Sequence, residues 1–570
     1  MDNLAIARIL REIADLLEIK NENPFKIRAY RNGADIAANH PHALAALDTA
    51  GLREIPGIGK DLAARIREIG ETGGSAYHRE LAAEFPPTVL DLLHLPGLGP
   101  KTVATLCREL GVRTLDDLAR AATHGRVRAL RGMGAKKEAQ ILKALAERKQ
   151  HAGHHLLPAT AEAAAALVTL LQERAPEAEI APVGSLRRGC ETCADLTLLA
   201  SGAPPSLMEA FVSDPRIERV LTRGETASRV LVRGGFEADL RLAPIESRGA
   251  AMQHLTGSTT HNIALRDHAI RLGFTLNDRG LFRLDDGVRV AGESEEGLYE
   301  GLGLAWVPPE LREGRGELEA AAERRLPRLI ERGDLRGDLH MHSTETDGKD
   351  DVLAMAEAAR EEGLEYIAIT DHSKSLTMAN GLDERRAMQH AARVRALDGA
   401  AGVRLLAGIE CDIKADGSLD LDDECLASLD FVVASVHSAF TQDRRQMTER
   451  LLRAIDHPQV DVLGHPTGRL LLRREPYPVD LEAVVDAAVR RGVALEINCQ
   501  VDRLDLSDVH AKLARDRGAA MIISSDAHSR RGLGALRWGV NVARRAWLEP
   551  AHVLNTRPLP EFLARLRRNR

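Results

Sequence analysis

Short apolar runs alternate with amphipathic helical segments along residues 336–570. Most of the runs are rich in Val, Ile, Leu and Ala and carry few charges, which is typical of strands buried on both faces of a parallel sheet. The runs lie at 337–342, 366–370, 404–410, 431–436, 460–464, 493–498 and 520–525. Helical periodicity lies between them, as at 351–362, 384–397 and 481–491. The alternation predicts a seven-stranded parallel (β/α) barrel at 336–570.

The first 150 residues follow a different pattern, in which short amphipathic helices are joined by three related glycine turns. Each turn reads apolar-x-Gly-apolar-Gly before a lysine and a helix, and the first glycines lie 40 and 35 residues apart. Glycine allows close backbone approach, and a helix N-terminus favours an anion such as a DNA phosphate. One such turn is usually a plain helix connection, but three in succession resemble helix-hairpin-helix motifs, which hold the DNA backbone without reading sequence. The residues expected to contact DNA there are Gly57, Gly59, Lys60, Gly97, Gly99, Lys101, Gly132 and Gly134.

Composition narrows the class of protein. The net charge of −7 does not indicate a nucleic-acid binder as a whole, so a DNA site must be a local patch. There is no run of 18 apolar residues and no signal-peptide layout at the start, so we expect a cytoplasmic protein without a membrane partner. Six cysteines in 570 residues do not form a disulfide framework. Cys190 and Cys193 lack the second pair that a zinc ribbon needs, and we expect ordinary thiols.

The middle of the chain carries a phosphate-binding pattern. A linker at 151–158 and a helix at 161–173 lead to a strand and then to Gly-Ser-Leu-Arg-Arg-Gly at 184–189. Backbone amides and guanidinium groups of such a loop suit the oxygens of a triphosphate. Thr-Gly-Ser at 256–258 and Gly-Phe-Thr-Leu-Asn at 273–277 follow.

With the helical N-terminus, these motifs resemble the family X DNA polymerases, and the resemblance covers the whole chain because bacterial members carry a C-terminal PHP (polymerase and histidinol phosphatase) domain. It implies a multidomain fold with an all-helical helix-hairpin-helix region, an α+β nucleotidyltransferase palm and thumb, and the seven-stranded barrel. The expected segments are 1–85 (helical DNA-gripping), 86–150 (fingers-like), 151–245 (palm), 246–308 (thumb), 309–335 (a charged linker) and 336–570 (PHP barrel). It implies nucleotide contacts at Gly184, Ser185, Arg188, Gly257, Asn262 and Arg266, and 5′-phosphate contacts at Lys26 and Arg31.

The resemblance also exposes departures from the family pattern. Family members hold two Mg²⁺ ions with three aspartates, and the matching positions here are Asp195, Thr197 and Asp239. A threonine hydroxyl adds no charge and cannot bridge two metals as a carboxylate does. His254-Leu255 stands where the family usually has an aromatic pair. We therefore expect DNA synthesis to be weak or lost, with Mg²⁺ or Mn²⁺ at this site if it is active.

A further departure concerns lyase chemistry. Arg65 matches the lysine with which some family members attack an abasic sugar. A guanidinium stays protonated and cannot attack a carbonyl, so this route is expected to be closed.

Ligand-type residues gather at the C-terminal ends of the expected barrel strands, where such barrels place their catalytic groups. A single histidine there is usually structural, but burying so many acids and imidazoles together without a metal would be costly. Their local sequences look like the PHP motifs throughout, and in that family such sets hold up to three Zn²⁺ or Mn²⁺ ions, with Glu410 expected to bridge. The expected ligands are His340, His342, Asp347, His372, Glu410, His437, His465, Asp526 and His528. Lys374 and Arg469 are either phosphate clamps or solvated charges.

The leading hypothesis is a DNA-repair enzyme whose barrel trims 3′ ends by metal-dependent phosphoester hydrolysis, while its N-terminal half holds gapped or 3′-ended DNA without sequence specificity. We expect a monomer that also takes a deoxynucleoside triphosphate if the palm is active. One alternative is a fully bifunctional polymerase and 3′-5′ exonuclease. A small-molecule phosphatase of the histidinol phosphatase type would leave the hairpin motifs without purpose, and a non-catalytic DNA scaffold would leave the barrel ligands idle.

Overall fold

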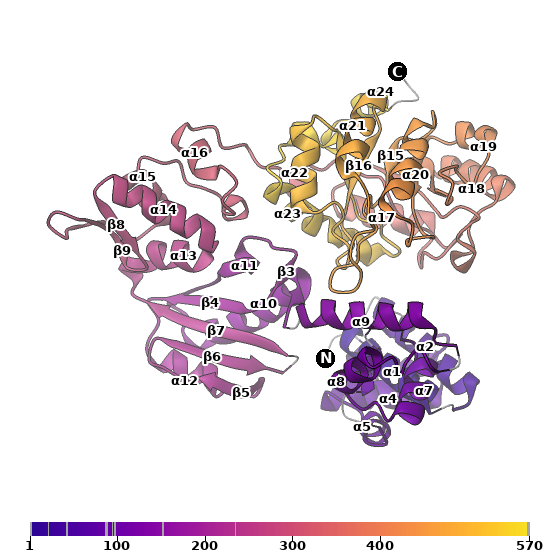
Figure 1. The fold of residues 1–570 in the computed structure, drawn as a ribbon, viewed down its shortest axis with the longest axis horizontal. Coiled ribbons are helices and arrows are strands. Elements are labelled where there is room, and N and C mark those ends of the chain that lie inside the picture. Colours follow the sequence, from indigo (N-terminus) through magenta and orange to yellow (C-terminus); the bar gives the residue numbers. More distant parts are fainter. Residues whose placement is uncertain are drawn as a thin grey trace. The chain divides into compact units, whose positions relative to one another are not determined.

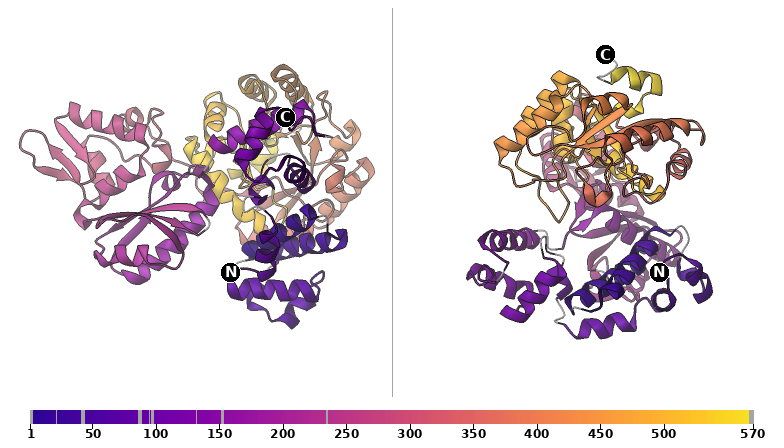
Figure 2. Two further views of the ribbon diagram at one scale, coloured as in Figure 1. Left: turned by 60° about the horizontal axis from the view of Figure 1, so that its bottom comes forward. Right: turned by 90° about the vertical axis from the view of Figure 1, so that its right-hand side faces the viewer.

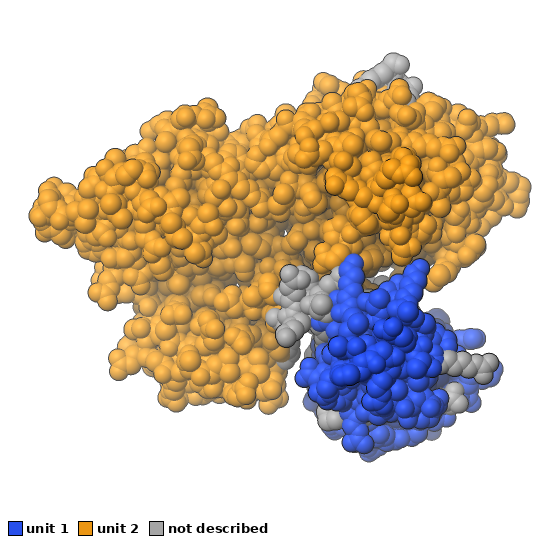
Figure 3. Space-filling model, viewed as in Figure 1, with its two compact units in different colours: residues 1–152 blue, residues 153–570 orange. Residues whose placement is uncertain are grey.

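The computed structural model describes residues 3–20, 22–40, 44–85, 89–93, 95, 98–130, 132–150, 153–233 and 235–566. The chain divides into two compact units, residues 1–152 and 153–570 (Figure 3). Within the described ranges, no helix is long and apolar enough to cross a membrane.

Unit 1 is helical throughout its described part, as the sequence predicts. Its helices are α1 (Asn3–Ile19), α2 (Pro24–Asn39), α3 (Thr49–Glu54), α4 (Lys60–Thr72), α5 (Ala76–Ala83), α6 (Val89–Leu93), α7 (Pro100–Leu110), α8 (Leu115–Thr123) and α9 (Ala135–Gln150). Apolar residues such as Leu10, Ile13, Ile66 and Leu106 form one buried core. Spacings of three, four and seven residues along α1, α4 and α7 place the buried side chains on one face of each helix.

Unit 2 begins with an α+β segment at the position of the expected palm. Five strands, β2 (Glu179–Pro182), β4 (Leu196–Ser201), β5 (Ile217–Thr222), β6 (Ala227–Val232) and β7 (Phe236–Ala243), form a sheet in the order β2-β4-β7-β6-β5 (Figure 1). Alternate residues of these strands pack with α10 (Leu157–Arg174) and α12 (Ser206–Val212) in one core. The other residues face away from that core, so the opposite face of the sheet is available for polar groups. A short antiparallel pair, β1 (His155–Leu156) and β3 (Thr192–Cys193), lies against α10.

The thumb follows with α13 (Arg248–Thr256), α14 (Thr259–Arg271), β8 (Phe274–Asn277), β9 (Gly280–Arg283), β10 (Arg289–Ala291) and α15 (Glu295–Gly301). Its strands form an antiparallel sheet in the order β10-β9-β8. The charged segment 309–335 folds into 3₁₀ turns and α16 (Glu317–Ala322). Leu311, Ala320 and Ala321 from this segment are buried in the thumb core beside Leu298 and Tyr299. The segment is thus built into the thumb by its few apolar residues.

The remaining residues form the predicted parallel barrel (Figure 2). Its strands pair in sequence order: β11 (Gly337–Asp338), β12 (Tyr366–Ile369), β13 (Arg404–Asp412), β14 (Phe431–Ser435), β15 (Val462–Leu463), β16 (Ala494–Asn498) and β17 (Met521–Ser524). A parallel bridge between Met341 and Ala527 links the two ends of this sheet, so the barrel is nearly closed. The first strand is shorter than expected, because regular pairing with β12 stops at Asp338.

Two apolar layers hold the barrel together. Its helices are α17 (Val352–Glu361), α18 (Glu384–Ala396), α19 (Asp423–Ser428), α20 (Arg444–Asp456), α21 (Leu481–Arg491), α22 (Asp508–Asp516), α23 (Leu536–Arg545) and α24 (Leu559–Arg565). A large core joins strands and helices, and a smaller one contains Tyr366, Phe431 and Ile522 from the strands with Phe562 from α24. Phe562 stacks on Tyr366 near the start of the strands. The opposite, C-terminal ends of the strands are left for polar side chains.

Candidate functional site

Ligand-type side chains gather at the C-terminal ends of the barrel strands. Glu410 lies near the end of β13, and the other eight follow their strands directly or, for Asp347, in the next loop. His340, His342, His372, Glu410, His465 and Asp526 are buried, and His437, His528 and Asp347 are more exposed. Because the strands are parallel, their C-terminal ends meet at one rim, and residues as far apart in sequence as His340 and His528 lie there together.

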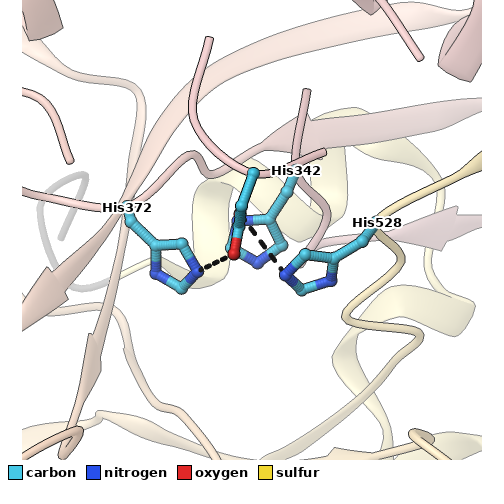
Figure 4. Close-up of side chains that lie close together, drawn as sticks. His342, His372 and His528 are labelled. Atoms are coloured by element: carbon cyan, nitrogen blue, oxygen red, sulfur yellow. Dashed lines mark ion pairs between the residues drawn. The ribbon is translucent and has the colours of Figure 1, made fainter. Parts of the chain in front are cut away.

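Eight of the nine side chains form three overlapping groups that could each hold a metal ion, and the ninth, His465, lies 2.9 Å from Glu410. His342, Asp347, His372 and His528 offer ligand atoms that all lie within 4.8 Å of one another. Two further groups of the same compactness are His340 with His342 and Asp526, and Glu410 with His372 and His437. His342 and His372 each belong to two groups. In Figure 4, His372 and His528 approach from opposite sides, with His342 between them.

Glu410 is the centre of the buried part of this site. Its Oε2 lies 2.8 Å from His372 Nδ1 and 3.4 Å from His340 Nε2. Its Oε1 lies 2.9 Å from His465 Nε2 and 3.2 Å from His437 Nε2. Burial raises the pKa of this carboxyl, but the surrounding histidines outweigh burial and hold the pKa well below its usual range. Glu410 is therefore a permanent anion among imidazoles.

The same environment shifts the pKa values of neighbouring histidines in opposite directions. Burial and the charges of His528 and His372 lower the pKa of His342 to about 4. Burial also acts to lower the pKa of His372 and His437, but Glu410 overrides it and raises them to about 10 and about 9. Protonated His372 and His437 thus neutralise the negative charge of Glu410. A metal cation could replace these protons and neutralise the same charge.

The donor set fits metal ions. The Nε2 atom of His340 and the Nδ1 atom of His342 are buried and make no hydrogen bond with any described residue. Buried polar atoms are almost always partnered, so imidazole nitrogens that face other ligand atoms without a hydrogen bond suit coordination. Imidazole and carboxylate groups together are the ligands that Zn²⁺ and Mn²⁺ take in proteins.

Supporting residues in or just after the strands orient these ligands, and they are not among the residues predicted from the sequence. Glu496 of β16 is fully buried, and its Oε1 lies 2.7 Å from His340 Nδ1. Its Oε2 accepts a 2.6 Å hydrogen bond from the backbone N–H of His465. A charged residue in the apolar run 493–498 was the signal that could have revealed Glu496. Carboxylates of this kind fix the tautomer and ring orientation of a ligating histidine.

Asp371 supports the loop that carries Asp347. It accepts hydrogen bonds from the backbone N–H of Ser343 at 2.8 Å and from the Ser343 hydroxyl at 2.6 Å. It also lies 2.8 Å from His390 Nε2 and accepts from the Thr346 hydroxyl. The conformation of the loop after β11 is therefore tied to the residue that precedes His372.

The palm places the three positions matched to the polymerase metal ligands on one face of its sheet. Thr197 of β4 pairs in register with Asp239 of β7, and Asp195 lies two residues before Thr197. Asp239 also pairs in register with Arg229 of β6, whose Nε lies 2.9 Å from Asp239 Oδ2. The hydrogen bond to Asp239, then the charges of Asp239, Glu237 and Asp195, raise the pKa of the Arg229 guanidinium.

The Gly-Ser-Leu-Arg-Arg-Gly loop is tied to the thumb through its arginines. Arg187 makes two hydrogen bonds to Glu295, at 2.8 and 2.7 Å. Arg188 donates to Glu313 at 2.9 Å and to the backbone carbonyl of Thr256 at 2.5 Å. A Cβ added to Gly257 would lie 3.2 Å from Arg188, so the loop lies directly against the Thr-Gly-Ser turn.

Two other expected nucleotide contacts lie on α14. Asn262 is held by the backbone carbonyl of His254 at 2.7 Å and by Gln253 at 2.8 Å, and Arg266 is exposed.

In unit 1 the glycine turns lie at the starts of helices, as predicted. Gly59 and Gly99 precede α4 and α7 as N-caps without a side-chain hydrogen bond. A Cβ at Gly59, Gly99, Gly132 or Gly134 would meet nothing within 4 Å among the described atoms, so these backbones are open to a ligand. Lys60 and Lys101 are exposed there. Gly97 lies outside the described residues.

The positions matched to 5′-phosphate contacts are engaged within unit 1. Lys26 Nζ lies 2.8 Å from the Tyr77 hydroxyl, and Arg31 forms ion pairs with Asp15 and Glu18. Arg65 lies over the Tyr77 ring at 4.8 Å and 3.3 Å from Glu68.

Models of known families match most of the chain. A helix-hairpin-helix domain matches residues 1–75, and a SAM-like helix-hairpin-helix tandem matches residues 89–147. The DNA polymerase beta thumb matches residues 251–313, and the PHP domain matches residues 338–500. A relative from Bacillus subtilis (strain 168), named DNA polymerase/3′-5′ exonuclease PolX, is 37% identical over 568 residues, which cover 99% of both chains. The chain belongs to the PolX family of bacterial family X DNA polymerases.

Other relatives of this PolX-family chain are shorter. A probable phosphatase from Shewanella sediminis (strain HAW-EB3) is 31% identical over 232 residues, covering 39% of this chain and 89% of that protein. A probable phosphatase from Edwardsiella ictaluri (strain 93-146) is 32% identical over 243 residues, covering 40% of this chain and 94% of that protein.

The two candidate phosphate clamps of the PolX-family barrel have different environments. Lys374 is partly exposed and forms an ion pair with Glu384. Arg469 is buried and makes two hydrogen bonds to Glu191 of the palm, at 3.0 and 2.6 Å. Since Glu191 follows the 184–189 loop and Arg469 follows His465, this ion pair connects the two candidate centres of unit 2.

Proposed function

We propose that this chain hydrolyses DNA phosphoesters at 3′ ends in its barrel, as a 3′-5′ exonuclease and phosphodiesterase of DNA repair. The observation that carries the proposal is the convergence of nine ligand-type side chains at one rim, eight of them in three overlapping groups. Family membership supports the DNA substrate, because the relative of equal length is named for polymerase and 3′-5′ exonuclease activity.

The proposed metal ligands are the nine residues named from the sequence. His342, Asp347, His372 and His528 would hold one ion, His340, His342 and Asp526 a second, and Glu410, His372 and His437 a third. The ninth, His465, would join through its position 2.9 Å from Glu410. We propose Zn²⁺ or Mn²⁺. When bound, such close-spaced dications act as Lewis acids on the phosphate and lower the pKa of water to give a nucleophile near neutral pH.

The protein's own residues define where a phosphate would enter. Asp347 and His528 have side chains that are 36% and 33% exposed, whereas Glu410 and His340 are 1% and 0% exposed. The substrate would therefore approach from the Asp347–His528 side, with Glu410 as the buried bridging carboxylate. Glu496 and Asp371 would keep the ligands oriented in the absence of substrate.

For the palm we propose weak or absent DNA synthesis, with Mg²⁺ or Mn²⁺ and a deoxynucleoside triphosphate as its ligands if it is active. Asp195 and Asp239 are the two carboxylates left at the matched positions, and Thr197 between them carries no charge. The second candidate function, a fully bifunctional polymerase and exonuclease, is favoured by the name of the Bacillus subtilis relative and by the match of residues 251–313 to the DNA polymerase beta thumb.

A small-molecule phosphatase is less well supported, because the phosphatase relatives cover only 39% and 40% of this chain.

We propose that the segments 1–85 and 86–150 grip gapped or 3′-ended DNA through their glycine turns. The segment 151–245 would then be the palm, 246–308 the thumb and 336–570 the nuclease. A monomer in the cytoplasm is part of the same proposal.

The test uses a labelled primer–template with a one-nucleotide gap, with Mn²⁺ or Mg²⁺ and with or without deoxynucleoside triphosphates. Wild type should shorten the primer, and His342→Ala should reduce shortening by at least about 100-fold, since removal of a metal ligand disables the centre. His457→Ala is the matched control, because His457 pairs with Asp423 on the barrel outside the ligand groups. Shortening that persists in His342→Ala would rule out the barrel nuclease. Robust extension by wild type, equal to that of Thr197→Asp, would rule out weak synthesis.

A further inference from the structure

The palm centre contains a cation from the protein itself. Thr197, Asp239 and Arg229 lie in register on the neighbouring strands β4, β7 and β6. Residues that pair in register point to the same face of a sheet, so these side chains form one row across three strands. The row places a neutral hydroxyl on one side of Asp239 and a guanidinium on the other.

Asp239 is covered by arginines on both of its oxygens. Arg229 Nε and NH2 each lie 2.9 Å from Oδ2, and Arg241 NH2 lies 3.8 Å from Oδ1. Arg229 also contacts a carboxylate outside the row, since its NH1 lies 3.6 Å from Glu237 Oε2. Asp239 is buried at 4% exposure, while the Arg229 side chain is 40% exposed. The guanidinium thus closes the solvent side of the carboxylate.

The local charges do not suit two dications. Asp195, Glu237 and Asp239 supply −3, and Arg229 and Arg241 supply +2, which leaves −1. A dication beside a fixed guanidinium meets Coulomb repulsion, which grows as solvent is excluded. Glu237 does not repair the loss of a carboxylate at Thr197, because its own contact is with the guanidinium.

We propose that the guanidinium of Arg229 takes the electrostatic place of one of the two metal ions, so that the palm binds no more than one dication. This inference rests on the proposed weakness of the palm in synthesis and gives it a second cause beside Thr197. A guanidinium next to a single dication retains the ability to hold phosphate oxygens, since arginine binds phosphate with charge-assisted hydrogen bonds. It cannot lower the pKa of a primer hydroxyl by coordination as a metal ion does.

The test counts Mn²⁺ ions bound to the full chain by electron paramagnetic resonance and measures primer extension in the same preparations. The variants are Thr197→Asp, Arg229→Gln and the double variant, each with the barrel ligands intact so that the barrel contributes the same number of ions throughout. The double variant should bind one more ion than wild type and extend a primer at least about tenfold faster than Thr197→Asp alone.

Two controls keep the result interpretable. Arg229→Lys combined with Thr197→Asp retains the positive charge and should gain neither the ion nor the extension. Arg223→Gln removes an arginine that pairs with Glu209 outside the row and should behave as wild type. Circular dichroism of each variant separates a folding defect from a loss of metal. Because the Arg229 side chain is 40% exposed, its substitution should leave folding intact.

Either of two outcomes would overturn the inference: an added ion in Thr197→Asp alone, or a double variant that binds no more than wild type. Failure of the proposed function is seen separately. Robust extension by wild type refutes weak synthesis, whereas the ion count alone decides the role of Arg229.

Discussion

The Nδ1 atom of His340 lies 2.7 Å from Oε1 of Glu496, and both side chains are fully buried. The same carboxylate holds the backbone N–H of His465, so a single residue of β16 orients a ligand that follows β11 and another that follows β15. This arrangement leaves the Nε2 atom of His340 facing Glu410 and Asp526.

Glu496→Gln should weaken metal binding without removing a ligand. We expect the dissociation constant for Mn²⁺ to rise by about 10- to 100-fold, because second-layer carboxylates fix the tautomer and basicity of the histidines that they contact. Titration of the metal-free protein measures the constant, and primer shortening at saturating Mn²⁺ should recover. If shortening stays lost at saturating metal while Mn²⁺ binds normally, Glu496 does not act through His340.

Metal binding should release protons. Glu410 raises the pKa of His372 to about 10 and that of His437 to about 9, against the opposing effect of burial, so both are protonated in the metal-free protein near pH 7. A metal must displace these protons, and its apparent affinity should rise as the pH increases from about 6.5 to about 9.

Burial acts to lower the pKa of the ligand His340, but Glu496, Glu410 and Asp526 outweigh burial and raise this pKa well above its usual range as well. Calorimetric titration in two buffers of different ionisation enthalpy should therefore show release of at least about two protons per chain. Glu410→Gln is the control, since it removes a charge that raises all three pKa values, and it should release fewer protons. A binding enthalpy that is the same in both buffers would contradict the expectation.

Lys101→Ala should weaken DNA binding without changing its sequence preference. Lys101 is exposed in the first turn of α7, two residues after the Gly99 N-cap. Loss of one phosphate contact should reduce the slope of log K against log salt concentration by about 0.9. Arg108→Ala at the other end of α7, where the side chain is 71% exposed, is the matched control. An unchanged salt slope in Lys101→Ala would show that this turn does not contact the backbone.

The Arg469–Glu191 ion pair should stabilise the junction of palm and barrel. Glu191→Gln and Arg469→Met should each lower the unfolding temperature by about 2 °C. The unfolding temperature of the double variant should be no lower than that of the less stable single variant. The exposed pair of Arg517 and Asp486, with contacts of 2.7 and 2.8 Å, should show almost no such coupling because surface pairs contribute little. Additive losses for Arg469 and Glu191 would mean that they act independently.

Much of the barrel could be predicted because local pattern and site coincide there. Strands buried on both faces give apolar runs, and parallel strands bring their C-terminal ends to one rim. Polar residues that interrupt the pattern at those ends, such as His372 and His437, therefore stood out as candidates. The structure brings eight of the nine into three groups and places His465 beside Glu410. The helical N-terminal unit was predictable for the same reason, since its periodicity and glycine turns are local features.

The sequence by itself determined the order and type of the elements and the chemical identity of the ligand groups. Only the tertiary structure decided which charges are neutralised by which partners. Arg469 and Glu191 lie 278 residues apart, and Glu496 and His340 lie 156 residues apart, so no periodicity links them. Arg229 could not be assigned to the palm centre until the register of β6 against β7 placed it opposite Asp239. Register and long-range packing are set by the burial of whole faces, and a linear pattern does not state which of many charged residues will meet across them.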